Sequence, residues 1–244
     1  MKRFELKYRP FGERSILVEW PQKIDESILN DIISFKNQLV NSYVKDIVDI
    51  NHTYSSLLIT YSSTIENFYD AFGELKSIYS SKYSEKSGST KLWKIPVCYD
   101  LDFASDLDHY ATQKNLGIKE VIALHTSSIH TVFFVGFLPG FLYLGGLDKR
   151  LHLPRKNTPN LNVKKGSVAI GGKQTGIYPQ NSPGGWHVIG RTPLNFFDTS
   201  KEVPCFASSG DKLQFHQIDL RTYNNIQTLV DAGVYQLESE DLDD

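Results

Sequence analysis

The chain has few cysteines, no long apolar run and no excess of charge of one sign. Cys98 and Cys205 are its two cysteines among 244 residues, too few and too far apart for a disulfide framework. Nowhere do about eighteen apolar residues follow one another, as a membrane span requires, and the N-terminus lacks the apolar core of a signal peptide. A formal net charge of -2 without a basic stripe argues against a nucleic-acid partner. These absences predict a folded cytoplasmic protein that binds neither membrane nor nucleic acid.

Familiar catalytic motifs are missing as well. There is no Gly-x-Ser-x-Gly segment to present a serine nucleophile. The histidines lack the paired spacing typical of metal sites. The sequence therefore predicts no metal site in this chain.

Two apolar periods alternate over the first part of the chain. Apolar residues recur at helical spacing after a capping residue at Asp25 and again over 65–78. Strand-like runs occupy 4–9, 15–20, 44–50 and 56–61. The order β-β-α-β-β-α predicts a small α+β sandwich domain over residues 1–79, and the polar stretch 80–91 is interpreted as a linker.

A different pattern begins at residue 92 and continues to 244. After a strand at 92–99, two short helices are expected at 106–113 and 118–126. Short strands separated by Gly/Pro corners then predict a closed or nearly closed barrel. These strands are expected at 131–135, 168–170, 186–189, 194–197 and 213–218, followed by a helix within 221–237 and a solvated acidic tail at 238–244.

Glycine and proline are unusually dense between Phe134 and Pro193. Glycine lets a ligand or partner approach the backbone, and proline freezes φ, so the density indicates rigid loops that display a few polar side chains. The alternative is that the barrel corners themselves require these residues. Both explanations remain open at this point.

Several polar side chains in these loops are suited to an anionic ligand. Lys173 and Gln174 follow two glycines whose amides can donate to an oxyanion, although a solvated hairpin tip would look the same. Arg155 and Arg191 flank proline corners, where a guanidinium loses little freedom on binding a carboxylate or phosphate. Their alternative is an ion pair with a loop carboxylate such as Asp148 or Asp198.

These arguments yield two sets of candidate site residues. His187 alternates with Trp186 along a strand and is a candidate acid or base if a pocket lies on its side. Catalytic roles are hypothesised for Lys173, Gln174, Arg155 and His187. Substrate or partner contacts are expected from Phe137, Pro139, Gly140, Gly172, Tyr178, Pro183, Gly184, Gly185, Trp186 and Arg191.

Long ordered segments of the chain resemble a known family. The runs GFLPGFLYLGGLDKRL, LPRKNTP and GSVAIGGKQTGIYPQNSPGGWHVIGRTPLNFFD, preceded by IPVCYD and EVIALHTSS, are similar to the family containing the B-type subunit of 5-oxoprolinase, the Kip-type sporulation kinase inhibitor and allophanate hydrolase subunit 1. FGERSILVEW and VDINHTYSSLLITY resemble its smaller first domain. The chain departs from the family after Cys98, where Tyr99-Asp100-Leu101-Asp102 replaces a glycine-rich segment.

The resemblance implies a fold, an activity and partners. It implies an α+β N-terminal domain followed by a mainly-β cyclophilin-like barrel domain, and a role in ATP-dependent opening of 5-oxoproline to glutamate. ATP with Mg²⁺ would be a co-substrate of the complex, with no cofactor tightly bound to this chain, and the partners would be the C-type and A-type subunits of 5-oxoprolinase. Alternatives are an inhibitor that binds a histidine kinase through the barrel, and a subunit of the allophanate hydrolase or urea amidolyase type.

Overall fold

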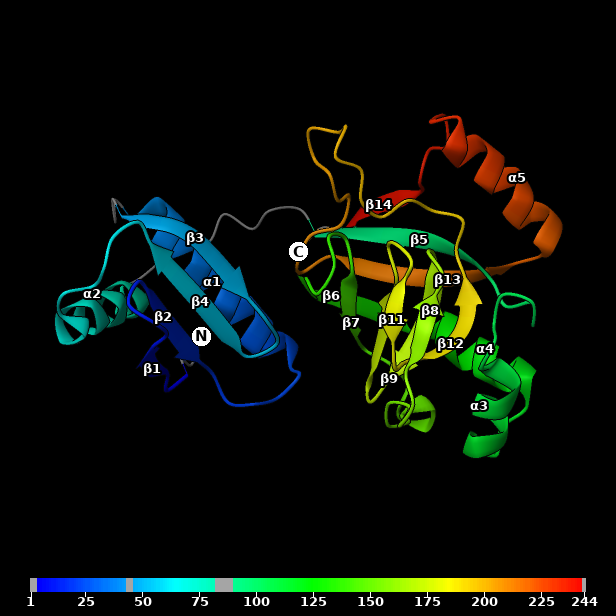
Figure 1. Ribbon diagram of the computed structural model, residues 1–244, viewed down its shortest axis with the longest axis horizontal. Coiled ribbons are helices and arrows are strands. Elements are labelled where there is room, and N and C mark those ends of the chain that lie inside the picture. The colour runs from blue at the N-terminus through cyan, green and yellow to red at the C-terminus, as the bar shows by residue number, and fades with distance from the viewer. Residues whose placement is uncertain (1–3, 43–45, 82–89, 243–244) are drawn as a thin grey trace. The chain divides into compact units, whose positions relative to one another are not determined.

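The computed structural model describes residues 4–42, 46–81 and 90–242. It divides into two compact units, Met1–Gly88 and Ser89–Asp244 (Figure 1). The linker expected at 80–91 falls mostly on residues 82–89, which lie outside the described residues, so it stays a prediction. Within the described ranges, no helix is both long and apolar enough to cross a membrane.

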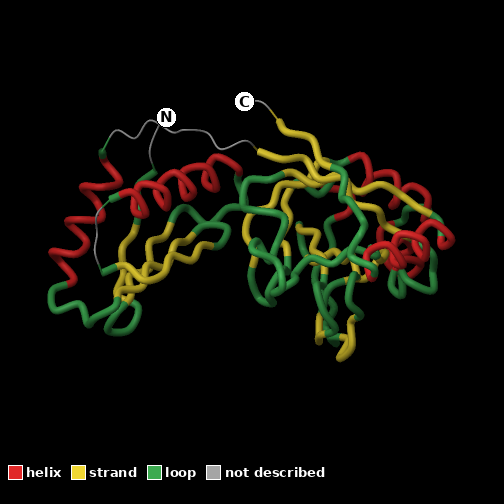
Figure 2. The backbone as a smooth tube through the Cα atoms, turned by 90° about the horizontal axis from the view of Figure 1, so that it is seen from above, coloured by secondary structure: helices red, strands yellow, loops and turns green. Residues whose placement is uncertain are grey.

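The first unit is a four-stranded antiparallel sheet with two helices. Its elements are β1 (Lys7–Pro10), β2 (Ser15–Glu19), α1 (Glu26–Asn41), β3 (Ile47–His52), β4 (Ser56–Tyr61) and α2 (Phe68–Ser80). The strand order is β1-β2-β4-β3, and α1 lies across one face of the sheet with α2 beside it (Figure 2). Asp25 caps α1 as predicted, because its carboxylate accepts from the Ser27 amide at 2.9 Å.

A buried carboxylate joins the sheet and the helices of this unit. Asp31 of α1 accepts hydrogen bonds from the Trp20 indole at 2.7 Å and from the Tyr79 hydroxyl of α2 at 2.6 Å. Both bonds go to the same oxygen, Oδ2, which is therefore paired in spite of its burial. The core of this unit therefore has a fixed polar link in addition to its apolar contacts.

The second unit is a mainly-β barrel with helices outside it (Figure 1). Seven strands close on themselves in the order β12-β9-β10-β7-β6-β13-β5, with closure between Arg191 of β12 and Cys98 of β5. The pair β5–β13 is parallel and the other pairs are antiparallel. The elements are β5 (Thr90–Cys98), α3 (Leu107–Lys114), α4 (Ile118–Ser127), β6 (Ile129–Val135), β7 (Leu142–Gly145), the 3₁₀ turn η1 (Lys149–Leu151), β8 (Asn160–Val163), β9 (Ser167–Gly171), β10 (Gln174–Ile177), β11 (Ser182–Gly184), β12 (His187–Arg191), β13 (Lys212–Ile218), α5 (Leu220–Asp231) and β14 (Ser239–Leu242).

The two faces of the barrel wall carry separate apolar clusters. Alternate residues such as Val168 and Ile170 belong to the main core, whereas Ala169 between them packs outside with Trp186 and Val163. The outer cluster lies under the two-stranded ribbon of β8 and β11. A strand sends successive side chains to opposite faces, so one wall serves both clusters.

Two expectations for this unit are wrong. Residues 194–197 form no strand, because Pro193 has no amide to donate and the Leu194 amide donates to the Thr192 hydroxyl instead. The acidic tail is not entirely solvated, since Ser239–Leu242 pairs antiparallel with β5. There Glu240 lies 3.6 Å from Lys94 and Asp241 lies 3.9 Å from Lys91, so two of the acidic residues meet lysines of the neighbouring strand.

Candidate functional site

The indole of Trp186 lies flat against two glycines of the barrel wall. A Cβ added to Gly171 would come within 2.5 Å of the ring, and one added to Gly176 within 2.8 Å. Phe141 stands edge-on to the indole at 5.7 Å, and the Tyr143 ring lies at 5.9 Å. We call these five residues the Trp186 platform.

Arg155 completes this arrangement with a positive charge. Its guanidinium lies 5.5 Å from the centre of the Trp186 ring, within the range of a cation–π contact. The side chain is exposed and forms no ion pair within the described part of the chain. The alternative pairing with Asp148 does not occur, because Asp148 binds Arg150 at 2.8 Å.

Two tyrosine hydroxyls lie within the electrostatic reach of Arg155. Burial raises the pKa of Tyr178 to about 12, while a backbone hydrogen bond from Trp186 and the charge of Arg155 act in the opposite direction. Burial likewise raises the pKa of Tyr143, and Arg155 again opposes it. Both phenols therefore stay protonated near neutral pH and can donate hydrogen bonds.

The loop that carries Arg155 is held at three points. The Lys156 amide donates to the Gly185 carbonyl at 2.7 Å, and the Lys156 ammonium binds the Asp106 carboxylate at 2.8 Å. The same Asp106 oxygen accepts from the Val188 amide at 2.7 Å. The third point is His187, whose Nε2 donates to the Pro154 carbonyl at 2.9 Å.

This geometry argues against an acid–base role for His187. The ring is 5% exposed and faces Tyr110 of α3, away from the Trp186 indole. Nε2 is used by Pro154, and Nδ1 is buried without a hydrogen-bond partner among the described residues. His187 therefore positions the Arg155 loop instead of meeting a substrate.

Lys173 and Gln174 lie at the turn between β9 and β10. Gly172 has a φ of 69° in the first position of this two-residue loop, as a type II′ turn requires. Lys173 is exposed and Gln174 is half-buried. Since Gln174 and Gly176 are two residues apart in one strand, Gln174 points to the face that carries the Trp186 platform.

The proposed oxyanion contact at Gly172 is wrong. Its amide donates to the Leu153 carbonyl at 2.7 Å, and its carbonyl accepts from the Leu153 amide at 3.0 Å. The Gly172 amide is therefore already used. These two hydrogen bonds between Leu153 and Gly172 place the segment before Arg155 beside the turn that carries Lys173. The structure therefore brings the two cations to one region.

The loop between β6 and β7 extends the apolar part of the site. Phe137, with a φ of 67°, is 65% exposed and meets Phe141 edge-on at 5.7 Å. Pro139 is exposed, whereas Gly140 is wedged against Phe197, where an added Cβ would come within 2.7 Å. The loop thus presents Phe137 and Pro139 next to the platform.

The expected residues 183–185 lie in β11 and directly after it. Gly184 faces the Tyr178 hydroxyl so closely that no Cβ fits between them. The Gly185 carbonyl accepts from the Lys156 amide, and Pro183 is exposed within the β8–β11 ribbon. These residues shape the site and offer it no reactive group.

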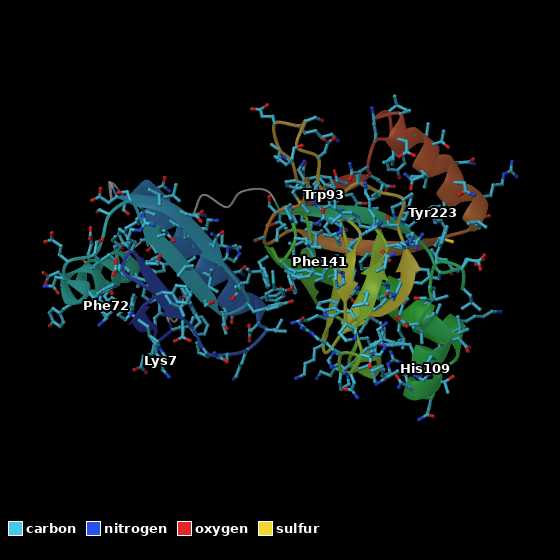
Figure 3. All side chains as sticks on the ribbon, in the orientation of Figure 1. Lys7, Phe72, Trp93, His109, Phe141 and Tyr223 are labelled. Atoms are coloured by element: carbon cyan, nitrogen blue, oxygen red, sulfur yellow. The ribbon has the colours of Figure 1, made fainter. Side chains whose placement is uncertain are left out.

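Arg191 does not belong to this group. It ends β12, whereas Trp186 precedes the start of the same strand. Its guanidinium lies 4.8 Å from the Phe103 ring, close to Tyr223 of α5. Phe141 and Tyr223 are labelled in Figure 3 and lie well apart within the barrel unit.

Some residues of the site are not among those expected from the sequence. Tyr143, Lys156 and Asp106 all contribute to it, and the third comes from a segment about fifty residues before Lys156. Tyr143 follows the alternation of β7 and could have been found by its period. Asp106 carried no such signal.

Residues described by the structure include no cluster of three or more His, Cys, Asp or Glu side chains able to hold a metal ion.

Comparison with known proteins identifies the family of this chain. A family profile described as carboxyltransferase domain, subdomain C and D, matches residues 6–207. The chain belongs to this family. The resemblance noted from the sequence is thereby confirmed, together with the α+β domain and the cyclophilin-like barrel that it implied.

The relatives match different shares of this chain. The B-type subunit of 5-oxoprolinase from Bacillus subtilis is 42% identical over 134 residues, 55% of this chain and 56% of that protein. The match thus spans little more than half of that relative. The B-type subunit of 5-oxoprolinase from Haemophilus influenzae is 33% identical over 213 residues, 84% of this chain and 95% of that protein. A crystal structure of Kluyveromyces lactis urea amidolyase has a TM-score of 0.83 over 98% of this chain and 16% of that chain, and at 22% identity it shows the fold alone.

Proposed function

We propose that this chain is the B-type subunit of an ATP-dependent 5-oxoprolinase complex, which opens 5-oxo-L-proline to L-glutamate. The observation that carries the proposal is the exposed Arg155 guanidinium on the Trp186 platform, without an ion pair in the described part of the chain. A guanidinium over an aromatic face suits a small carboxylate whose ring stacks beside it. The relatives named as B-type subunits of 5-oxoprolinase support this reading.

The reaction needs an activated lactam, because amide resonance makes its carbonyl a poor electrophile. The lactam oxygen attacks the γ-phosphorus of ATP, and the bond to ADP breaks. Water then adds to the activated carbon, the C–N bond breaks, and the nitrogen takes a proton to become the amine of glutamyl phosphate. A second water releases phosphate and leaves glutamate. Positioned cations and N–H or O–H donors stabilise the charge that develops, with Mg²⁺ accompanying the nucleotide.

This chain supplies part of that environment. Arg155 would bind the substrate carboxylate from its place over the Trp186 indole, and the half-buried, protonated Tyr143 would donate a hydrogen bond. Trp186 and Tyr178, at 5% and 2% exposed, would form the wall that supports them. Lys173 and Gln174 lie at the edge of the same face, where they would meet a second polypeptide or the nucleotide. We infer that the site is shared with the C-type partner, that the A-type partner completes the enzyme, and that the chain alone is inactive.

Arg155 provides the decisive variant. We expect Arg155→Ala, in a complex reconstituted from this chain and its C-type and A-type partners, to raise KM for 5-oxoproline about tenfold or more, because a charge-assisted hydrogen bond is lost. Arg155→Lys should restore part of the loss. Arg150→Ala is the matched control, since Arg150 is also exposed but binds Asp148.

Three results would contradict the proposal. The first is ATP-dependent turnover by the isolated chain, and the second is an unchanged KM in Arg155→Ala with assembly intact. The third is turnover of allophanate instead of 5-oxoproline by the reconstituted complex, which would favour a role in an allophanate hydrolase or urea amidolyase. Size-exclusion chromatography of each variant separates loss of assembly from loss of binding.

A second candidate function is inhibition of a histidine kinase. It is favoured by Phe137, which is 65% exposed beside the platform and is suited to anchor a protein partner. If it holds, Phe137→Ala should abolish kinase binding in a pull-down and leave 5-oxoproline turnover unchanged. Absence of kinase binding by the unmodified chain would discard it.

A further inference from the structure

A hollow region lies at the opposite end of β12 from the Trp186 platform. Two cavities of about 650 Å³ and 250 Å³ open between α5 and the segment that follows β12. They share part of their lining, so they adjoin. The shared residues are Leu194, Asn195, Asp198, Val230 and Gly233. We call the pair the α5 hollow.

The larger cavity has a cationic end. Arg191, Lys164 and Lys165 line it, and none of the three forms an ion pair within the described ranges. Arg191 is held over the Phe103 ring at 4.8 Å and contacts the Tyr223 hydroxyl, so its orientation is set before any ligand arrives.

The carboxylates of the α5 hollow accept hydrogen bonds from neutral groups, and the charges of Lys201 and Lys165 also act on Asp198. Asp198 accepts from the amide of Ser200 at 3.0 Å and from its hydroxyl at 2.7 Å. Asp231 accepts from Gln227 at 2.9 Å. Three cations thus face two carboxylates in the larger cavity, and Lys201 adds a fourth cation in the smaller one.

The loop that carries the two lysines is fixed against β12. Gly166, with a φ of 79°, lies so close to the Thr192 carbonyl that no side chain fits there. The Gly166 amide donates to the Tyr178 carbonyl at 2.8 Å, and the Lys165 amide donates to the Asn181 side chain at 2.8 Å. The backbone of this loop is therefore fixed, and the exposed lysine side chains extend from it.

The smaller cavity has an apolar side and a polar side. The polar side is formed by Asn195, Asp198 and Lys201, and the apolar side by Leu194, Phe206, Val230, Tyr235 and Leu237. Leu194 and the neighbouring Phe196 are almost fully buried, at 4% and 1% exposed, so this wall belongs to the rigid core of the barrel. An apolar wall next to several cations is an arrangement suited to an amphipathic acid.

We propose that the α5 hollow binds a small organic carboxylate with an apolar body. The carboxylate lies against Arg191 and the two lysines, and the apolar body fills the cavity lined by Phe206 and Val230. This site does not depend on the proposed 5-oxoprolinase function, because it shares no residue with the Trp186 platform.

The purified chain is titrated with 3-phenylpropionate, and binding is followed by isothermal calorimetry and by NMR. Acetate lacks the ring and 3-phenylpropanol lacks the charge, so both are expected to bind at least about tenfold more weakly. Arg191→Gln should weaken 3-phenylpropionate binding about tenfold, since a charge-assisted hydrogen bond is lost. Arg221→Gln on the exposed start of α5 and Arg155→Gln at the platform should leave binding unchanged.

Lys165→Gln gives a second, independent variant in case Arg191→Gln fails to fold, because Lys165 is exposed. It should weaken binding in the same direction, by about threefold or more. No binding of 3-phenylpropionate at about 10 mM, equal binding of 3-phenylpropanol, or undiminished binding by both the Lys165 and the Arg191 variants would overturn the proposal.

Discussion

At the scale of single residues, the site depends on the absence of two Cβ atoms. Gly171 and Gly176 leave the space in which the Trp186 indole lies, and Arg155 rests on that indole. A methyl group at either glycine would push the ring away from the wall, because the neighbouring atoms are ring carbons without room to move. The cation then loses its platform.

We expect Gly171→Ala to lower the free energy of unfolding by about 1–3 kcal/mol and to reduce turnover by the reconstituted complex. Urea unfolding followed by tryptophan fluorescence measures the first effect. Gly73→Ala in α2 is the control, since an added Cβ there meets nothing within 4 Å, and alanine favours a helix by about 0.5–1 kcal/mol. Equal stability and turnover in both variants would contradict the account of the platform.

The sequence could indicate these glycines and Trp186 as a group, but it could not say what they do. The Gly172 amide looked available from its neighbours along the chain, yet it is used by Leu153, about twenty residues earlier in sequence. His187 looked reactive, yet the Pro154 carbonyl uses its Nε2. Hydrogen bonds between distant segments consume the groups that a local motif seems to offer.

At the scale of elements, the edge of β5 shows how a distant segment completes a sheet. Ser239–Leu242 pairs with Thr90–Trp93, and without it the outer edge of that part of β5 would meet water. The ion pairs that accompany this pairing involve half-exposed side chains, so they contribute little. Backbone pairing is the main contribution of β14.

Deleting residues 238–244 should therefore lower the free energy of unfolding of the barrel by about 1–3 kcal/mol, while Leu237 stays in place against the core. The double variant Glu240→Gln/Asp241→Asn keeps the backbone and should cost less than about 1 kcal/mol. Thermal unfolding of the two proteins side by side decides the matter. A larger loss in the charge variant than in the truncation would show that the ion pairs dominate.

At the scale of the whole molecule, two buried histidines link the stability of the barrel to pH. His125 and His130 are fully buried with rings 5.2 Å apart, and His125 Nδ1 lies 2.7 Å from the Tyr99 hydroxyl. Burial lowers the pKa of His125 well below its usual value and that of His130 to about 4. Both rings are neutral in the folded protein at neutral pH.

The stability of the barrel decreases as the pH is lowered. Below an unfolded pKa of about 6.5 the unfolded chain takes up protons that the folded barrel refuses, so stability is full above that pH and falls toward pH 4. We expect His130→Gln to make the loss between about pH 6.5 and pH 4 less steep, as measured by urea unfolding at several pH values. His109→Gln, at an exposed position, should leave the slope unchanged. An unchanged slope in both variants would contradict the role of the buried pair.

The α+β domain and the barrel that follows it could be predicted from the sequence, because apolar periods and Gly/Pro corners are local properties of the chain. The region of the candidate site was inferred from the same corners and stays a prediction. Which polar groups remain available depends on contacts between distant segments. The tertiary structure separated Arg191 from Arg155 by the length of β12, paired the tail with β5 and recruited Asp106 to hold the Arg155 loop. Each of these contacts joins segments that are far apart in the sequence. They form only when the barrel strands have paired, so local patterns do not specify them.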